Sequence, residues 1–206
     1  MNKNKLLDAL LLPQSLYLRL TDRRRILYAG ILLVGILDVI FLYISKVSTL
    51  FAGKPGNVLF INVVLALVIA VLIGIMDVVF FSVPVFDVFK LFRREDAALK
   101  SRSFLIRVMK IYIIANLLVV PGHILYFILF HGVNLDARID LQNSAVFLDM
   151  LIFLWYTAAI TRGICASYKF QFVQKSMVFL IVYLWNFLLS GCLEYMMNNW
   201  FLKLFM

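Results

Sequence analysis

Long runs of hydrophobic residues, separated by short clusters of charged ones, dominate this sequence. Five runs are long enough for a helix to cross a hydrocarbon core of about 30 Å, which takes roughly 20 residues. Because lipid offers the backbone no hydrogen-bond partner, each run is expected to be helical. The pattern predicts an all-α polytopic membrane bundle with five transmembrane helices, near residues 26–45, 58–86, 111–130, 145–161 and 177–200.

Two segments outside these runs have a mixed, amphipathic character. Residues 6–20 carry leucines but are too short, and too interrupted by Pro13, to span a membrane. They are interpreted as an interfacial helix under the inner leaflet, with an extension of the first span as the alternative. The loop 87–110 is predicted to form a basic amphipathic helix. No linker or repeat divides the chain, so residues 1–206 are expected to be a single membrane domain.

Composition excludes a soluble globular domain. Hydrophobic residues make up 64% of the 206 residues and charged residues only 15%, against about 45–50% and about 25% in soluble proteins. Lys and Arg outnumber Asp and Glu by 20 to 11. In a membrane protein this excess is typical of cytoplasmic loops facing anionic lipid, so we expect lipid partners and no nucleic acid.

The distribution of positive charge predicts the orientation. Sixteen of the twenty Lys and Arg residues fall on one side of the predicted spans, which places the N-terminus in the cytoplasm and, after five spans, the C-terminus outside a cell membrane. The cations nearest the inner surface are expected to contact lipid headgroups: Arg23, Arg24, Arg25, Arg93, Arg94, Lys100 and Arg102.

Ionisable residues inside the spans are costly in lipid and therefore informative. Four of them each lie thirteen residues from a flanking cation, about 20 Å along a helix, and would share one level in the bundle: Asp38, Asp77, His123 and Asp149. Three more polar residues complete the predicted intramembrane polar cluster: Asn116, Asn186 and Glu194. The cluster fits either interhelical hydrogen bonds that fix the bundle or a relay for protons or ions.

Motifs for catalysis, nucleotides or metals are absent from the sequence. The two histidines are too few for a typical metal cluster, and the two cysteines form no CxxC pair. We therefore expect a protein that is not an enzyme and that uses no cofactor or metal.

The pattern resembles the Yip1 domain family in its compact bacterial form. The resemblance rests on Leu12–Pro13 before the first span, five spans, the basic loop, Tyr112 and Pro121 in the third span, and the segment LDMLIFLWYTAAITRGI at 148–164. It implies a five-helix integral membrane protein with a cytoplasmic N-terminus. Eukaryotic relatives bind small GTPases through a longer N-terminus and through DLYGP and GYGLP motifs that are missing here, so GTPase binding is not implied.

These features predict a non-enzymatic Yip1-like membrane protein that organises or shapes the membrane and binds lipids, partner membrane proteins or a second copy of itself. The alternative is a small transporter, channel or lipid-translocating protein that uses the intramembrane polar cluster. A continuous water-accessible cavity reaching the carboxylates would favour the alternative.

Overall fold

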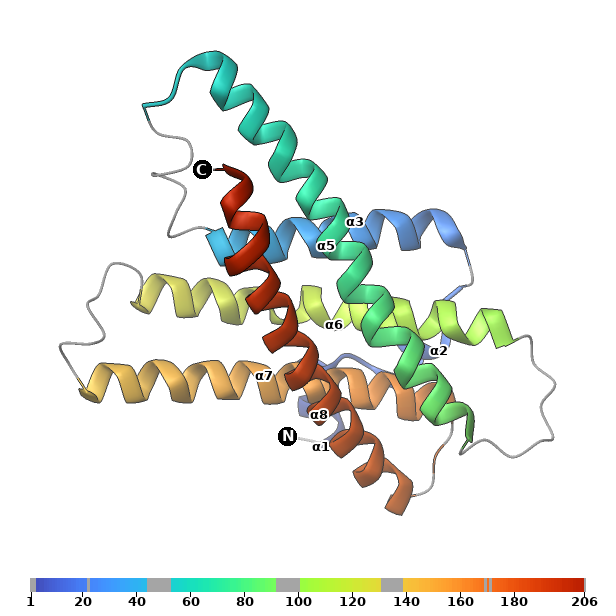
Figure 1. The fold of residues 1–206 in the computed structure, drawn as a ribbon. Helices are drawn as coiled ribbons and strands as arrows, with labels where there is room; N and C mark the ends of the chain where they lie inside the picture. Colours follow the sequence, from blue (N-terminus) through green and yellow to red (C-terminus); the bar gives the residue numbers. More distant parts are fainter. Residues whose placement is uncertain are drawn as a thin grey trace. The chain divides into compact units, whose positions relative to one another are not determined.

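The structure is a computed structural model that describes residues 3–21, 23–43, 53–91, 101–130, 139–168, 170 and 172–205 (Figure 1). Every regular element in these ranges is a helix, as the hydrophobic runs predict. The elements are α1 (Lys3–Leu11), α2 (Gln14–Leu18), α3 (Arg24–Tyr43), α5 (Gly56–Leu91), α6 (Ser101–Phe130), α7 (Ile139–Tyr168), α8 (Phe172–Met196), the π-helix η3 (Met197–Phe201) and the 3-10 helix η4 (Leu202–Phe205).

Four helical segments within the described ranges are long and apolar enough to cross a membrane. They are Gly56–Lys90, Ser103–Phe130, Asp140–Tyr168 and Gln174–Leu204. Each extends beyond the corresponding predicted span, because hydropathy marks only the part suited to lipid whereas a helix continues into the aqueous layer. The protein is therefore an all-helical, membrane-embedded chain. Helix α3, of 20 residues, corresponds to the first predicted span, and the count of five stays a prediction.

The third helix begins much earlier than predicted. Helix α6 starts at Ser101 rather than near residue 111, so residues 101–110 are its first turns and not a separate amphipathic helix. None of the side chains at 103–110 is exposed, and Lys110 is only 5% exposed. Residues 101–110 are thus helical and their apolar side chains pack into the protein, while contact of this basic segment with lipid stays a prediction. Residues 92–100 of the predicted loop lie outside the described residues.

Prolines lie inside two of the long helices. From the sequence, Pro84 is expected to bend or end the second span near the cytoplasm. Helix α5 does not end there but continues to Leu91. Pro121 likewise lies within α6. A proline removes one backbone donor, and this loss is tolerated in membrane helices where neighbouring groups satisfy the freed carbonyl.

The chain separates into two compact units, and each is described by itself. Unit 1 contains Met1–Thr21 and Ile114–Leu184. Unit 2 contains Asp22–Ile113 and Trp185–Met206.

In unit 2, α3 crosses and packs against α5 (Figure 1). A hydrophobic cluster joins Ile69 and Ile73 of α5 to Met197 and Leu202 at the C-terminal end, with Val39 of α3 packed against it. The indole Nε1 of Trp185 on α8 donates a hydrogen bond of 3.0 Å to the carbonyl oxygen of Phe80 on α5. These contacts hold α3 and α5 together with the C-terminal part of the chain, from Trp185 onwards.

In unit 1, the two short N-terminal helices pack against α7. In place of one helix over 6–20, α1 and α2 are separated at Leu12–Pro13, where Leu12 has a φ of 63°. Neither helix continues into α3, which begins at Arg24, so the segment is not an extension of the first span. Elsewhere in the unit, Gly122 of α6 lies against Ile152 of α7, where a Cβ would approach the Ile152 side chain to 3.1 Å.

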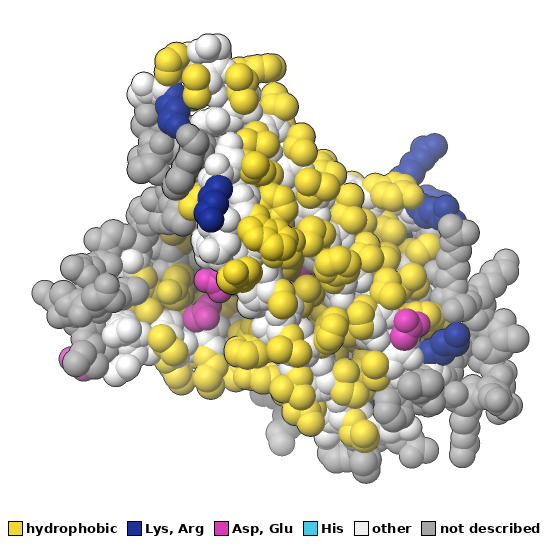
Figure 2. Space-filling view, in the orientation of Figure 1, with side chains coloured by type: hydrophobic (Ala, Val, Ile, Leu, Met, Phe, Trp, Pro, Cys, Tyr) yellow, Lys and Arg dark blue, Asp and Glu magenta, His cyan; other side chains and the backbone are white. Residues whose placement is uncertain are grey.

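The surface of the described residues is largely apolar. Figure 2 shows hydrophobic side chains over most of the visible face. At least 60% of the side chain is exposed for several large hydrophobic residues spread over the long helices, namely Ile26, Tyr28, Phe60, Ile61, Ile128, Val146, Phe147, Phe187 and Tyr195. Such a surface is stable in contact with lipid and would be an aggregation hazard in water.

Candidate functional site

Helices α3 and α5 of unit 2 approach each other closely at two glycines. A Cβ added to Gly35 of α3 would overlap the carbonyl oxygen of Ala70 and lie 2.8 Å from the backbone nitrogen of Gly74, both on α5. Small residues let helix backbones approach in this way, and lipid supplies no hydrophobic force that could substitute for close packing. In the sequence, Asn62, Ala66, Ala70 and Gly74 recur at every fourth residue, which predicts a small-residue ridge leading to Asp77. The sequence does not single out the glycine partner of this ridge on α3.

Two carboxylates lie one turn beyond these glycines. Asp38 follows Gly35 by three residues and Asp77 follows Gly74 by three, so each acid shares a helix face with its glycine. The two acids lie close enough to interact electrostatically. Oδ2 of Asp38 is buried and has no hydrogen-bond partner among the described residues.

Tyr112 of α6 joins α5 to a third helix. Its hydroxyl donates a hydrogen bond of 2.6 Å to Oδ1 of Asp77, which is only 5% exposed. The Tyr112 ring stacks on Phe81 with a centroid separation of 4.1 Å. A second contact joins α3 to α6. Gly30, five residues before Gly35, leaves room for Ile113 of α6, whose side chain would lie 2.8 Å from an added Cβ. The site is therefore a buried acid held by a tyrosine between tightly packed helices.

Unit 2 also buries the amide of Asn186 on α8. It is 3% exposed, and its Nδ2 has no hydrogen-bond partner among the described residues. Asn186, Ser190, Glu194 and Asn198 recur at every fourth residue, which predicts one polar seam along the last span. Of these residues, Ser190, Glu194 and Asn198 are exposed. The seam is thus buried at Asn186 and open at Glu194, whose place in a bundle interior stays a prediction.

Unit 1 contains the other members of the predicted polar cluster. Asn116 of α6 donates a hydrogen bond of 2.8 Å from Nδ2 to the Tyr156 hydroxyl on α7. His123 is partly buried and interacts electrostatically with Asp149, whose own side chain is exposed. The structure thus brings together two pairs, Asp38 with Asp77 and His123 with Asp149, one in each unit. That all four residues lie at one level of the bundle stays a prediction.

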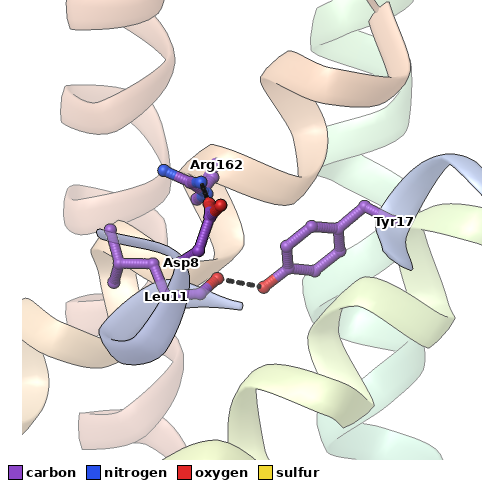
Figure 3. A network of polar contacts seen from close by, with 4 residues as sticks. All are labelled: Asp8, Leu11, Tyr17 and Arg162. Carbon is purple, nitrogen blue, oxygen red and sulfur yellow. Dashed lines mark hydrogen bonds and ion pairs between the residues drawn. The ribbon is translucent and has the colours of Figure 1, made fainter. Parts of the chain in front are cut away.

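A second polar network, missed by the sequence reasoning, fastens the N-terminal segment to α7 (Figure 3). Arg162 forms an ion pair with Asp8 of α1. The Tyr17 hydroxyl donates a hydrogen bond of 3.0 Å to the carbonyl oxygen of Leu11, and Nε1 of Trp155 donates one of 2.7 Å to that of Leu10. Tyr17 is fully buried, and this burial raises its pKa from 10.0 to about 12.

Only part of the predicted lipid-headgroup surface falls on described side chains. Arg23, Arg24 and Arg25 are exposed at the beginning of α3 and, with Ile26, line a shallow surface hollow. The side chain of Arg102 is not among those described. Three further predicted cations lie outside the described residues: Arg93, Arg94 and Lys100. Their lipid contacts stay predictions.

No group of three or more His, Cys, Asp or Glu that could hold a metal ion occurs among the described residues. Searches of family models, curated proteins and solved structures find no match to this chain. The class that the fold defines is therefore an all-helical membrane-embedded protein, and its function has to be argued from its own residues.

Proposed function

We propose that the chain is a non-enzymatic, Yip1-like integral membrane protein that organises or shapes the membrane and binds lipids or partner membrane proteins. In this proposal α3 is the first of five spans, the N-terminus is cytoplasmic, the C-terminus is outside and the host is a cell membrane. The N-terminal segment acts as an interfacial element on the cytoplasmic side.

The observation that carries the proposal is the way the N-terminal segment is attached. Two short helices with exposed leucines, Leu7 and Leu10 on α1 and Leu16 and Leu18 on α2, are fixed on α7 by the Asp8–Arg162 ion pair and by hydrogen bonds. A rigidly attached apolar element beside a membrane helix occupies lipid volume on one side of the bilayer. Arg19, exposed just after α2, adds a cation that favours anionic headgroups by about 1 kcal/mol.

The buried polar groups support a structural rather than a catalytic role for the intramembrane cluster. Asp77 is already bonded to Tyr112, and the backbones of α3 and α5 touch at Gly35 and Gly74. Polar side chains used in this way fix the register of membrane helices and contribute roughly 0.6 kcal/mol each.

One observation favours the alternative of a small transporter, channel or lipid-translocating protein. Oδ2 of Asp38 is buried without a hydrogen-bond partner among the described residues, beside a second buried acid. Two neighbouring carboxylates in a low dielectric repel each other strongly, so that one of them binds a proton or both share a cation. A transport role would use that proton or cation.

One reconstitution experiment tests both functions. The purified protein is inserted into vesicles of neutral and anionic lipid at increasing density, and vesicle diameter and the leak of an entrapped pH dye are recorded together. The proposal expects the mean diameter to fall as protein density rises, with no leak above empty vesicles. A proton leak that Asp77→Asn abolishes, at unchanged vesicle diameter, would establish the alternative instead.

A further inference from the structure

The C-terminal end of α1 has an unusual set of hydrogen-bond partners. A helix leaves its last four carbonyl groups without partners inside the helix, and at an aqueous surface water satisfies them. Here two of them receive side-chain donors from aromatic residues: the indole of Trp155 serves Leu10 and the phenol of Tyr17 serves Leu11. Aromatic donors with large apolar bodies supply hydrogen bonds where water is absent.

The turn after α1 is also unlike an aqueous helix end. Leu12 adopts the left-handed conformation, φ 63°, at the position where helices in water usually place Gly or Asn. Pro13 follows and has no backbone N–H that would need a partner. The turn is thus formed by half-buried apolar residues and leaves few unsatisfied backbone groups, which is what a hydrocarbon environment requires.

The partners on α7 give the depth of this turn. Trp155 and Arg162 are seven residues apart, which is about 10 Å along the helix axis. Arg162, near the end of α7, binds Asp8, whereas Trp155, farther into the span Asp140–Tyr168, binds Leu10. Along α1 the chain therefore passes from the charged level of Arg162 towards the apolar level of Trp155.

Several leucines of the two short helices are exposed, whereas Tyr17 is turned into the protein. Leu7 and Leu10 on α1 are 44% and 48% exposed, and Leu18 on α2 is 57% exposed. In the sequence, cations flank the apolar middle of the pair, at Lys3 and Lys5 in the first turn of α1 and at Arg19 after α2. Charged ends with an apolar middle match a segment that enters one leaflet and returns to the same surface.

We propose that α1 and α2 form a re-entrant helix pair embedded in the hydrocarbon of one leaflet, with the Leu12–Pro13 turn as its deepest point and lipid acyl chains against its leucines. This goes beyond a helix that lies flat under the leaflet, and it rests on the proposed membrane-shaping function for its use. Held by α7, the pair is a wedge that expands one leaflet only.

The test measures depth in vesicles of mixed neutral and anionic lipid. Cys165 and Cys192 are replaced by Ser, and single cysteines are placed at the exposed positions Leu10, Leu16 and Arg19 and spin-labelled. We expect labels at Leu10 and Leu16 to be relaxed by oxygen, which dissolves in lipid, and to be protected from a water-soluble nickel complex by at least about tenfold relative to the label at Arg19.

Two results would overturn the proposal. Equal access of the nickel complex to all three labels would mean that the pair lies at the aqueous surface. Protection of the Leu10 and Leu16 labels from oxygen as well as from nickel would mean that protein, from this chain or a second copy, covers the leucines. Because label depth is read without regard to vesicle diameter, failure of the wedge and failure of membrane shaping are distinguishable.

Donor-removing variants test the carbonyl argument directly. Trp155→Phe and Tyr17→Phe each delete one hydrogen bond to an α1 carbonyl while keeping an aromatic ring. We expect either change to raise nickel access at Leu10 by severalfold, since the freed carbonyl draws the turn towards water. The matched controls, Trp200→Phe and Tyr195→Phe, alter exposed aromatic residues and should change nothing. Unchanged access at Leu10 in both donor variants would refute the argument.

Discussion

Gly74→Ala tests whether backbone contact between α3 and α5 holds unit 2 together. An added Cβ would overlap the carbonyl oxygen of Ile31 and lie 2.9 Å from the nitrogen and 3.1 Å from the Cα of Gly35. All three are backbone atoms, so no side chain can rotate away and the helices must separate by roughly 1 Å to restore ordinary van der Waals contact. Overpacking of this kind costs about 1–3 kcal/mol.

Gly191→Ala is the matched control, because it lies inside α8 and an added Cβ would have nothing within 4 Å. Replacing Gly by Ala in a helix gains up to about 1 kcal/mol in propensity at either position. The difference between the two variants therefore isolates the packing cost. We expect Gly74→Ala to be less stable than Gly191→Ala by about 1–3 kcal/mol. Unfolding in mixed micelles with increasing denaturing detergent, followed by helicity, measures this difference. Equal stability of the two variants would refute the backbone contact.

Two further predictions concern single tyrosines and their partners. Asp77→Asn keeps the oxygen that accepts the Tyr112 hydrogen bond and should fold normally. Asp77→Leu should lower the free energy of unfolding by on the order of 1 kcal/mol in the same assay. A Leu variant as stable as the Asn variant would contradict the bond. Because burial raises the pKa of Tyr17 from 10.0 to about 12, docking of the N-terminal segment should be independent of pH below 10 and weaken between pH 10 and 12. The fluorescence of Trp155, retained as the single tryptophan, should follow this loss and should not do so in Tyr17→Phe; identical titrations would exclude Tyr17 as the cause.

Hydrophobic runs were sufficient to predict the helices, because lipid leaves the backbone no other regular structure. They could not predict where α6 begins, since hydropathy averages over a window in which Arg107 and Lys110 mask the buried Phe104 and Val108. The boundary is set by packing of those apolar residues within unit 2, and packing is not encoded in a local average.

Depth counting places Asp38, Asp77, His123 and Asp149 at one level, which stays a prediction, and it could not predict which polar groups are buried. Asp149 and Glu194 are exposed among the described residues, although they follow the same counting or the same helical seam. The ion pair between Asp8 and Arg162 joins residues 154 positions apart, and no local pattern in either segment specifies its partner. Such long-range pairs follow from the arrangement of helices and have no signal in one sequence.

The spacing of glycine and aspartate explains why unit 2 needs both residue types. In lipid, burial of apolar surface does not favour one helix partner over another, so association depends on close packing and on hydrogen bonds. Gly35 and Gly74 provide the close approach, but a smooth contact would tolerate sliding or rotation of one helix on the other. Asp77, one turn beyond the contact, is bonded to Tyr112 of α6, and this bond forms only in one rotation of α5 about its own axis, which fixes the face that α5 presents to α3. The glycines thus set the distance between helices and the acid sets their register, which is why each should fail differently when replaced.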